Sequence, residues 1–304
     1  MAPTTTRDLP EATDPKAFVQ LHAFDTATMK SNAAVVIKGH RGSGTANSWR
    51  HLIVHEPSGT KLWFDLGISE DLSQYPSFVR DHLHKMFGVS AGKNSILDDL
   101  QSLDIDAKAI KYIIPSHAHW DHIYPVATYF PQAKLLCGPG TLRLTAESWP
   151  EHANSHFDGR IWNPQTSELP VEELPDPATD PSYWQKIGPF DHGHDFFGDG
   201  SFWLIRAPGH CQGNLIALVR TKNKAGERRW VVLAGDASHS YHLLRYPNAP
   251  FGDGLPLNKS GTMHEDPEEA RKVLHKLYAV KAAYDDELFV WPAHVDALEG
   301  IWEF

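Results

Sequence analysis

Short hydrophobic runs recur along the chain, and most of them are bounded by Gly, Pro, Asn or Asp. Runs of about four to eight residues rich in β-branched and aromatic side chains are typical of buried strands. We therefore expect strands at 33–38, 49–55, 61–67, 111–115, 134–137, 202–206, 215–219, 230–234 and 288–291. The turn at Pro57-Ser58-Gly59 predicts that 49–55 and 61–67 form a hairpin.

Apolar residues at helical spacing predict four helices. Two of them, at 78–87 and 95–103, precede the strand at 111–115, and a third is expected directly after it, at 121–130. The fourth opens at Asp266-Pro267-Glu268-Glu269, a capping-box arrangement with proline at the first helical position. The order of strands and helices predicts an α/β fold in which sheets are covered by helices.

Two segments lack this regular pattern. The first 30 residues predict a polar N-terminal arm with a short apolar patch at 18–21. Residues 138–200 are rich in Pro, Trp, Asp and Gly, which is typical either of a lid or binding insertion or of a set of surface loops. We expect one domain over 1–304 that carries this arm and this aromatic-rich insertion. The aromatic side chains either line a pocket or pack the insertion onto its scaffold: Trp149, Trp162, Trp184, Phe190, Phe196 and Phe197.

Composition narrows the classes of function. The chain has 304 residues, of which 41% are hydrophobic, enough for a sizeable core. A formal charge of -10 argues against a nucleic-acid surface, which would need a basic patch. Cys137 and Cys211 are too few for a disulfide framework. The sequence shows no membrane-length apolar run and no secretory signal, so we expect a cytoplasmic protein without nucleic-acid or membrane partners.

The candidate chemistry centres on the residues that follow the strand at 111–115. His117 and His119 are two apart, so on an extended chain they point the same way and can reach one metal ion together. Asp121 and His122 begin the next turn and point elsewhere, which lets one segment serve two adjacent cations. A single histidine is usually structural, but four ligand-type side chains in six positions at a strand end predict a metal site.

Other strands also end in ligand-type residues, namely His210, Asp236 and His294. If these strand ends meet at one edge, seven ligands converge, which is enough for two ions. Asp65 ends the predicted hairpin, and we expect it to cap a turn or to support a ligand rather than to bind metal itself. The stretch Asp191-His192-Gly193-His194-Asp195 looks like a second cluster, but no strand precedes it. We interpret it as a loop outside the metal site, with contact between one histidine and substrate as the weaker alternative.

The ordered set of motifs resembles the metallo-β-lactamase superfamily. The matching motifs are His-x-His-x-Asp-His at 117–122, Pro-Gly-His at 208–210, Gly-Asp at 235–236 and the late His294, and Asp65-x-Gly67 matches as well. The resemblance covers about 33–294. It implies an αββα sandwich with a dinuclear metal centre at one edge of its two sheets.

The resemblance also implies how the ligands divide. By it, the first ion is held by His117, His119 and His210, the second by Asp121, His122 and His294, and Asp236 bridges both. Imidazole and carboxylate ligands suit zinc, so we expect two zinc ions per chain, although iron, manganese and cobalt stay open. Two such ions about 3.5–4 Å apart activate a water molecule that attacks a carbonyl group, and Asp121 is placed to orient it or to carry a proton.

Within the superfamily, the chain is most similar to the lactonase-like branch, which opens homoserine lactones and, in related fungal enzymes, γ-lactams such as benzoxazolinones. The form His-x-His-Trp-Asp-His and the continuation Asp236-Ala237-Ser238 carry this resemblance. It implies a zinc-dependent lactonase or lactamase that opens a small cyclic ester or amide. Lactonases often have tyrosine three residues after the bridging aspartate, where this chain has His239, with Tyr241 two residues further on. Either residue can contact the substrate carbonyl, or both form a polar wall.

Other functions on the same scaffold fit less well. A glyoxalase-II-like thioesterase would use the same metals, but no basic cluster near the C-terminus would recognise an anionic thiol carrier. A nuclease would need a basic surface, and a diiron reductase usually has glutamate where this chain has His119. A non-catalytic binding module is disfavoured because a structural zinc needs only four closed ligands.

Overall fold

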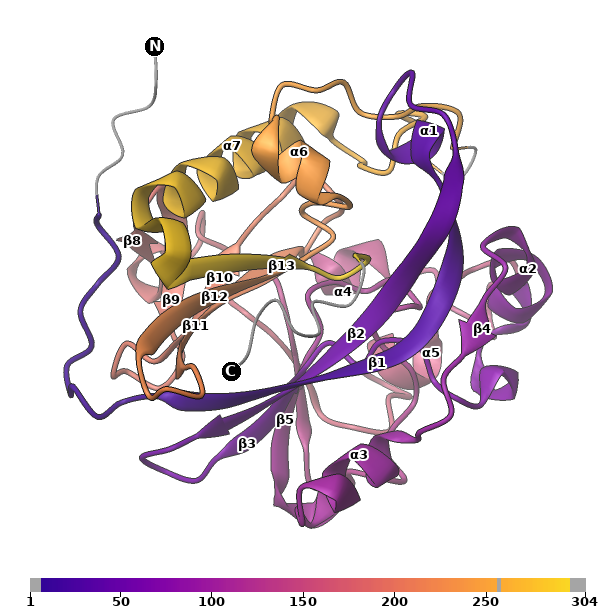
Figure 1. Cartoon of the computed structure of the whole chain (residues 1–304). Helices are drawn as coiled ribbons and strands as arrows, with labels where there is room; N and C mark the ends of the chain where they lie inside the picture. The colour runs from indigo at the N-terminus through magenta and orange to yellow at the C-terminus, as the bar shows by residue number, and fades with distance from the viewer. Residues whose placement is uncertain (1–6, 256–257, 296–304) are drawn as a thin grey trace.

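Two stacked β-sheets form the centre of the molecule in this computed structural model, which describes residues 7–255 and 258–295 (Figure 1). Within those residues the first sheet has seven strands in the order β4-β1-β2-β3-β5-β6-β7, and the second has six in the order β13-β12-β11-β10-β9-β8. The strands of the first sheet are β1 (Val19–Asn32), β2 (Ser43–His55), β3 (Lys61–Phe64), β4 (Ser90–Ala91), β5 (Ile110–Ile114), β6 (Lys134–Cys137) and β7 (Val171–Glu173). Those of the second are β8 (Gln185–Ile187), β9 (Phe190–Asp195), β10 (Phe202–Arg206), β11 (Leu215–Lys222), β12 (Arg228–Gly235) and β13 (Leu288–Pro292).

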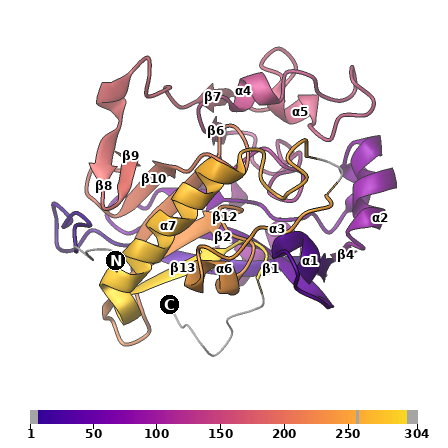
Figure 2. The same cartoon turned by 90° about the horizontal axis from the view of Figure 1, so that it is seen from above.

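Most helices are short and lie outside the sheets, and the longest, α7, crosses the second sheet when the molecule is seen from above (Figure 2). The α-helices are α1 (Ala33–Val36), α2 (His84–Met86), α3 (Ile96–Ser102), α4 (Thr141–Leu144), α5 (Gly159–Trp162), α6 (Tyr241–Arg245) and α7 (Pro267–Tyr284). A π-helical turn precedes α2, and four 3-10 turns complete the helical segments: Val79–Leu83, then Leu72–Gln74, Ala107–Ala109, Pro181–Tyr183 and Asp285–Glu287. Across the described residues, no helix combines the length and the apolar character that crossing a membrane requires.

Alternation of side chains along the strands places one core between the two sheets and one core outside each sheet. In β3, Leu62 and Phe64 face the second sheet, whereas Trp63 points outward into a core that includes residues of α3. In β12, Leu233 faces the first sheet and Val232 packs outward against α7. Because strand side chains alternate between faces, each sheet is buried on both sides. Each large apolar side chain that is fully buried contributes about 1.5–3 kcal/mol to the stability of the fold. The predicted αββα layering is therefore confirmed.

The strand directions place several strand ends at one edge of the sandwich. β3 is parallel to β5, and β12 is parallel to β13. β10 and β12 are both antiparallel to β11, so they run in the same direction as each other. The segments that follow β5, β10, β12 and β13 carry the candidate ligands, and the segment that follows β3 carries Asp65.

The N-terminus of α7 forms as the sequence predicts. Asp266 is the N-cap, and its carboxylate accepts hydrogen bonds from the backbone N–H groups of Glu268 and Glu269 at 3.1 Å each. Pro267 occupies the first helical turn, where a missing N–H leaves no partner unsatisfied.

Two expectations about the N-terminal region are wrong. Residues 19–30 belong to β1, which pairs with β2 along almost its whole length, rather than to a polar arm. Many polar side chains of β1 lie on its more exposed face and conceal the strand pattern. Residues 33–36 form the one-turn helix α1 instead of a strand, because the Asn32 side chain caps it by accepting from Ala34 N. Its apolar Val35 and Val36 resemble a strand segment in sequence.

Two further expectations are also wrong. Residues 121–130 form turns rather than a helix, because Pro125 lacks the N–H group that a helix interior needs. Residues 191–195 belong to β9 rather than to a loop, and they pair with β10, with His194 opposite Leu204. The stretch 138–200 thus supplies β7 to the first sheet and β8 and β9 to the second, so much of it is part of the sandwich.

Candidate metal centre

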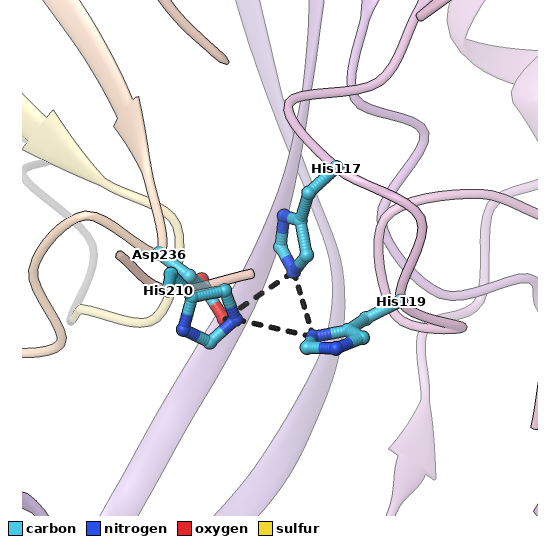
Figure 3. Close-up of side chains that lie close together, drawn as sticks. All are labelled: His117, His119, His210 and Asp236. Atoms are coloured by element: carbon cyan, nitrogen blue, oxygen red, sulfur yellow. Dashed lines mark hydrogen bonds and ion pairs between the residues drawn. The ribbon is translucent and has the colours of Figure 1, made fainter. Parts of the chain in front are cut away.

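Histidine and aspartate side chains from the ends of four strands meet at the edge of the sandwich in two groups. The first group contains His117, His119, His210 and Asp236 (Figure 3). The second group contains Asp121, His122 and His294. Within each group, one nitrogen or oxygen atom of every residue lies within 4.8 Å of those of the others. The structure thus brings together all seven residues that the sequence identifies as candidate ligands.

In the first group, three imidazole nitrogens point toward one position. His119 Nδ1 lies 2.9 Å from His117 Nε2 and 3.1 Å from His210 Nε2. Asp236 Oδ2 lies 3.4 Å from His210 Nε2 and 3.8 Å from His117 Nε2. Lone pairs that converge in this way suit a shared cation.

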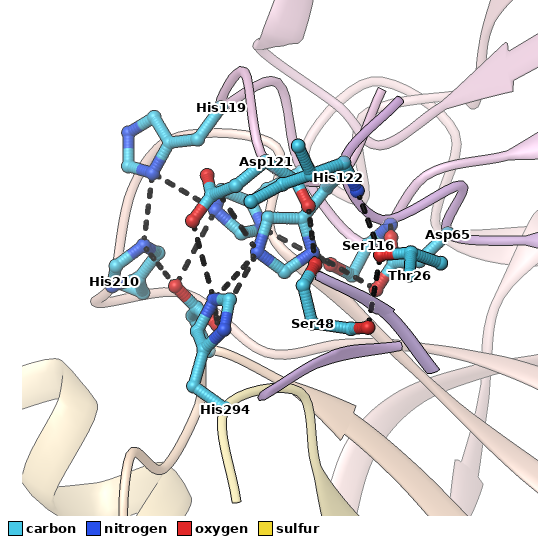
Figure 4. A network of polar contacts seen from close by, with 12 residues as sticks. Thr26, Ser48, Asp65, Ser116, His119, Asp121, His122, His210 and His294 are labelled. Atoms are coloured by element: carbon cyan, nitrogen blue, oxygen red, sulfur yellow. Dashed lines mark hydrogen bonds and ion pairs between the residues drawn. The ribbon is translucent and has the colours of Figure 1, made fainter. Parts of the chain in front are cut away.

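The second group, whose Asp121, His122 and His294 are labelled in Figure 4, lies around the other oxygen of Asp236. Asp236 Oδ1 lies 3.4 Å from His122 Nε2 and 3.2 Å from His294 Nε2. Asp121 Oδ2 lies 3.3 Å from His294 Nε2, and the two Nε2 atoms are 3.3 Å apart. Asp236 therefore directs one oxygen toward each group.

Partners behind the ligands fix the orientation of two imidazoles. His122 Nδ1 lies 3.0 Å from Asp65 Oδ2, and His294 Nδ1 donates to the backbone carbonyl of Asn47 at 2.9 Å. A hydrogen bond at Nδ1 leaves Nε2 to face the group. Asp65 also accepts from Ser116 N at 2.6 Å, and its φ of 53° lies in the left-handed region, which Asp tolerates better than most residues. Asp65 therefore has the supporting role that the sequence predicts.

A glycine lets the two sheets approach at this edge. Gly235, at the end of β12, has a φ of 48°, and a Cβ atom there would lie 2.7 Å from the Ser116 side chain. Leu215 N donates to Ser116 O at 2.7 Å, which ties the second sheet to the loop after β5. The close approach brings Asp236 into contact with the histidines of the first sheet.

The electrostatic environment differs between the groups. Burial, together with neighbouring imidazoles, lowers the pKa of His117 well below its usual value, and burial also lowers the pKa of His210. In the second group, burial opposes protonation, but nearby carboxylates prevail: they raise the pKa of His122 well above its usual value and that of His294 to about 10. The first group thus offers neutral imidazoles, and the second attracts positive charge, whether from a proton or from a metal ion.

The residues also pass a test of fit for a metal. Asp236 Oδ1 is buried and makes no hydrogen bond of regular geometry within the described part of the chain, and the nearest polar atoms are the Nε2 atoms of His294 and His122, at 3.2 and 3.4 Å. A buried carboxylate oxygen without such a partner is costly unless a cation lies beside it. Five imidazoles and two carboxylates are donors that suit zinc and other first-row divalent ions.

Three further histidines border the two groups. His239 Nε2 lies 3.2 Å from Asp236 Oδ2, whereas Tyr241 begins α6 with its ring 6.2 Å from Phe289. The sequence did not indicate His156 or His264. Their rings lie 5.7 Å from His119 and 5.5 Å from His210, respectively. No regular strand precedes either residue, so spacing alone offered no signal for them.

Most of the six aromatic side chains proposed for a pocket pack the scaffold instead. Trp162, Trp184 and Phe190 are buried in the three cores, and Phe197 stacks on His55 with ring centroids 3.8 Å apart. A different aromatic residue, Phe157, faces the first group, with its ring 6.4 Å from that of His119.

The histidines of β9 lie outside both groups of candidate ligands. His194 stacks on Tyr183 with ring centroids 3.9 Å apart, and its Nδ1 donates to Tyr183 O at 3.3 Å. His192 lies 6.5 Å from Trp184, measured between ring centroids.

Similar proteins share both the sequence pattern and the fold. The chain is 36% identical over 203 residues to the metallo-hydrolase mfmC of Annulohypoxylon moriforme, of which it spans 49%. It is 33% identical over 192 residues to the gamma-lactamase MBL2 of Gibberella moniliformis, with 62% of this chain and 74% of that protein covered. No family profile matches the chain.

Solved structures agree on the architecture. A mutant of B. thuringiensis AiiA with N-decanoyl-L-homoserine bound at its active site superposes with a TM-score of 0.62 at 15% identity, covering 93% of this chain and 95% of that one. The dizinc quorum-quenching lactonase AidC superposes with a TM-score of 0.56 at 16% identity, covering 95% and 92%. At such identities the likeness establishes the fold.

Two facing sheets with a histidine and aspartate cluster at their common edge define a protein of the metal-binding αββα class. The chain belongs to the metallo-β-lactamase superfamily, where its relatives include gamma-lactamases and N-acyl homoserine lactonases.

Proposed function

We propose that this protein is a dinuclear metal-dependent hydrolase that opens a small cyclic ester or amide, such as a lactone or a benzoxazolinone-like γ-lactam. The observation that carries the proposal is Asp236, whose two oxygens face two separate groups of imidazole and carboxylate donors. The names of its relatives support the substrate class, since they include gamma-lactamases and N-acyl homoserine lactonases. The chain spans about half of the length of the metallo-hydrolase mfmC. The activity of the whole protein is therefore part of the proposal.

In this proposal His117, His119 and His210 would hold one ion, Asp121, His122 and His294 would hold the other, and Asp236 would offer one oxygen to each. Zinc suits these donors, and AidC, which shares the fold, is a dizinc lactonase. When bound, two such ions supply Lewis acidity and lower the pKa of water. That chemistry makes a serine or cysteine nucleophile unnecessary.

The remaining steps belong to side chains of this protein. Asp121 is partly accessible at the centre, and its carboxylate orients the attacking water or carries its proton. We assign to His239, whose Nε2 lies 3.2 Å from Asp236 Oδ2 beside the two groups, the hydrogen bond to the carbonyl oxygen of the substrate. Tyr241 packs near Phe289, so we assign it a lesser role as part of the pocket wall.

The test is hydrolysis by purified protein whose metal content has been measured. The substrates are an N-acyl homoserine lactone, an aromatic γ-lactone, benzoxazolinone and a glutathione thioester, each with a chelator-treated control. We expect chelator-sensitive opening of at least one ring. Turnover of the thioester alone would replace the proposal with a glyoxalase-like thioesterase, and two bound ions without any turnover would favour a binding module.

A further inference from the structure

One strand outside the ligand set contacts the second group at consecutive positions. In β2, the backbone carbonyl of Asn47 accepts from His294 Nδ1 at 2.9 Å. The next residue, Ser48, donates from Oγ to the backbone carbonyl of Asp121 at 3.3 Å (Figure 4). Both contacts support residues of the second group from β2.

Ser48 is itself held rigidly. Its side chain is almost fully buried, and its backbone carbonyl accepts from Thr26 Oγ1 at 2.9 Å. Thr26 Oγ1 in turn accepts from Ile68 N at 3.0 Å. These bonds fix the backbone of Ser48, and from that fixed point its buried side chain donates to the Asp121 carbonyl.

Arg50, two residues further along β2, secures the segment that follows the ligands. Its guanidinium contacts Asp99 Oδ2 at 2.7 Å, Tyr124 Oη at 3.1 Å and the Asn94 carbonyl at 3.1 Å. Arg50 is only 1% exposed. A buried guanidinium with three partners is a rigid support, and Tyr124 comes two residues after His122.

The first group is supported differently. Its described support comes from its own loop, where Ser116 Oγ lies 2.9 Å from His117 Nδ1. His119 is the most exposed of its histidines. The two groups share Asp236 and the Ser116 hydroxyl, which also lies 3.3 Å from His122 Nδ1. The contacts from β2 described above go to residues of the second group.

We propose that Ser48 and Arg50 are positioning residues that set how tightly the second group holds its ion, while leaving the first group nearly unaffected. The inference rests on the proposed dinuclear centre. Outer partners of metal ligands typically change metal affinity by about 10–100-fold, and we expect a loss in that range for the second group alone.

The test measures metal retained per chain during dialysis of the metal-loaded protein against graded chelator. Ser48→Ala removes only the hydroxyl, and Tyr124→Phe removes only one partner of Arg50, so both should fold. Each is placed in two backgrounds: His119→Ala, which weakens the first group, and His294→Ala, which weakens the second. We expect Ser48→Ala and Tyr124→Phe to lower ion affinity about 10-fold or more in the His119→Ala background and less than about 3-fold in the other.

Two controls separate positioning from general stability. Ser48→Thr keeps the hydroxyl and should restore retention. Ser201→Ala removes another buried serine, on the turn before β10, and should leave retention unchanged in both backgrounds.

The outcomes are distinguishable. Equal losses in both backgrounds, or no loss in either, would overturn the positioning role while leaving a dinuclear hydrolase intact. If the unmodified protein retains no metal, the proposed function fails and the inference fails with it.

Discussion

The two groups of candidate ligands are built from similar side chains but are held in different ways. The first group takes its histidines from two loops, and His210 Nδ1 makes no hydrogen bond in the described structure. In the second group, His122 and His294 each have a fixed acceptor behind the ring, the Asp65 carboxylate and the Asn47 carbonyl. Ligand identity alone therefore does not define such a centre, because the surrounding hydrogen bonds decide how rigid each half is.

The two groups also differ in the charges that surround their histidines. Three carboxylates surround His122 and raise its pKa, whereas burial keeps the imidazole of His117 neutral. Protons therefore compete with metal more strongly at the second group than at the first. The comparison predicts that the two ions will leave in sequence rather than together, with the second group losing its ion first as the pH falls.

The largest expected effect comes from the residue that the groups share. Asp236→Ala removes one ligand from each group, so we expect both ions to be lost. Lewis acidity supplies several kcal/mol of transition-state stabilisation, so hydrolysis should fall by about 10³-fold or more. Metal analysis together with initial rates checks this. Retention of both ions and of activity would refute the bridging role.

Acid should destabilise the fold through a buried histidine behind the second group. His51 is almost fully buried on β2, and burial lowers its pKa to about 4, although the nearby Asp65 carboxylate opposes this shift. The unfolded chain, with a pKa of 6.5, binds the proton more readily, so the free energy of unfolding falls as the pH drops from 6.5 to 4. The shift of about 2.5 units corresponds to roughly 3 kcal/mol.

Replacing His51 by Leu should remove the pH-dependent part of the free energy of unfolding that this histidine contributes. We expect the variant and the parent protein to differ little at pH 7.5, and the difference between them to move in favour of the variant by roughly 3 kcal/mol by pH 4. Denaturant unfolding of both proteins across this range, with the same metal content, provides the measurement. Parallel pH profiles would show that His51 is not the titrating group.

Removing the charge of Asp65 should have a smaller effect, and it should lower the metal affinity of one group without lowering that of the other. Asp65→Asn keeps the side-chain volume, and Asn tolerates the left-handed backbone at this position, but the charge behind His122 is lost. We expect the affinity for the second ion to fall about 10–100-fold, with the first ion retained. Stepwise removal by chelator, followed by metal analysis, would reveal this. Simultaneous loss of both ions would contradict the independence of the groups.

Much of the sandwich was predictable because buried strands leave a clear signal. β6 and β10 have the predicted bounds, and the helix after Asp266 is confirmed. The hairpin predicted from 49–55 and 61–67 also forms, although β2 begins at Ser43 and β3 ends at Phe64. β1 was not predictable in the same way, since its polar side chains are accommodated by pairing with β2. β9 likewise depends on β10, a partner that local sequence does not indicate.

The candidate metal ligands were also predictable from the buried strands. Each of the seven candidate ligands lies just after a hydrophobic strand, so their convergence could be predicted once the strands were expected to share an edge. His156, His264 and Ser48 could not, because their proximity depends on how loops and strands pack in three dimensions. The cytoplasmic location and the single-domain organisation stay predictions.

The smallest expected effect tests whether the ligands are confined to the two groups. His192→Ala and His194→Ala alter the second histidine-rich stretch, where His194 stacks on Tyr183 within the second sheet. Loss of that stacking should lower stability by about 0.5–1.5 kcal/mol. Metal content should not change, in contrast to a parallel His119→Ala variant. Loss of an ion from the β9 variants would mean that the histidines on this strand, rather than those at the strand ends, hold part of the metal.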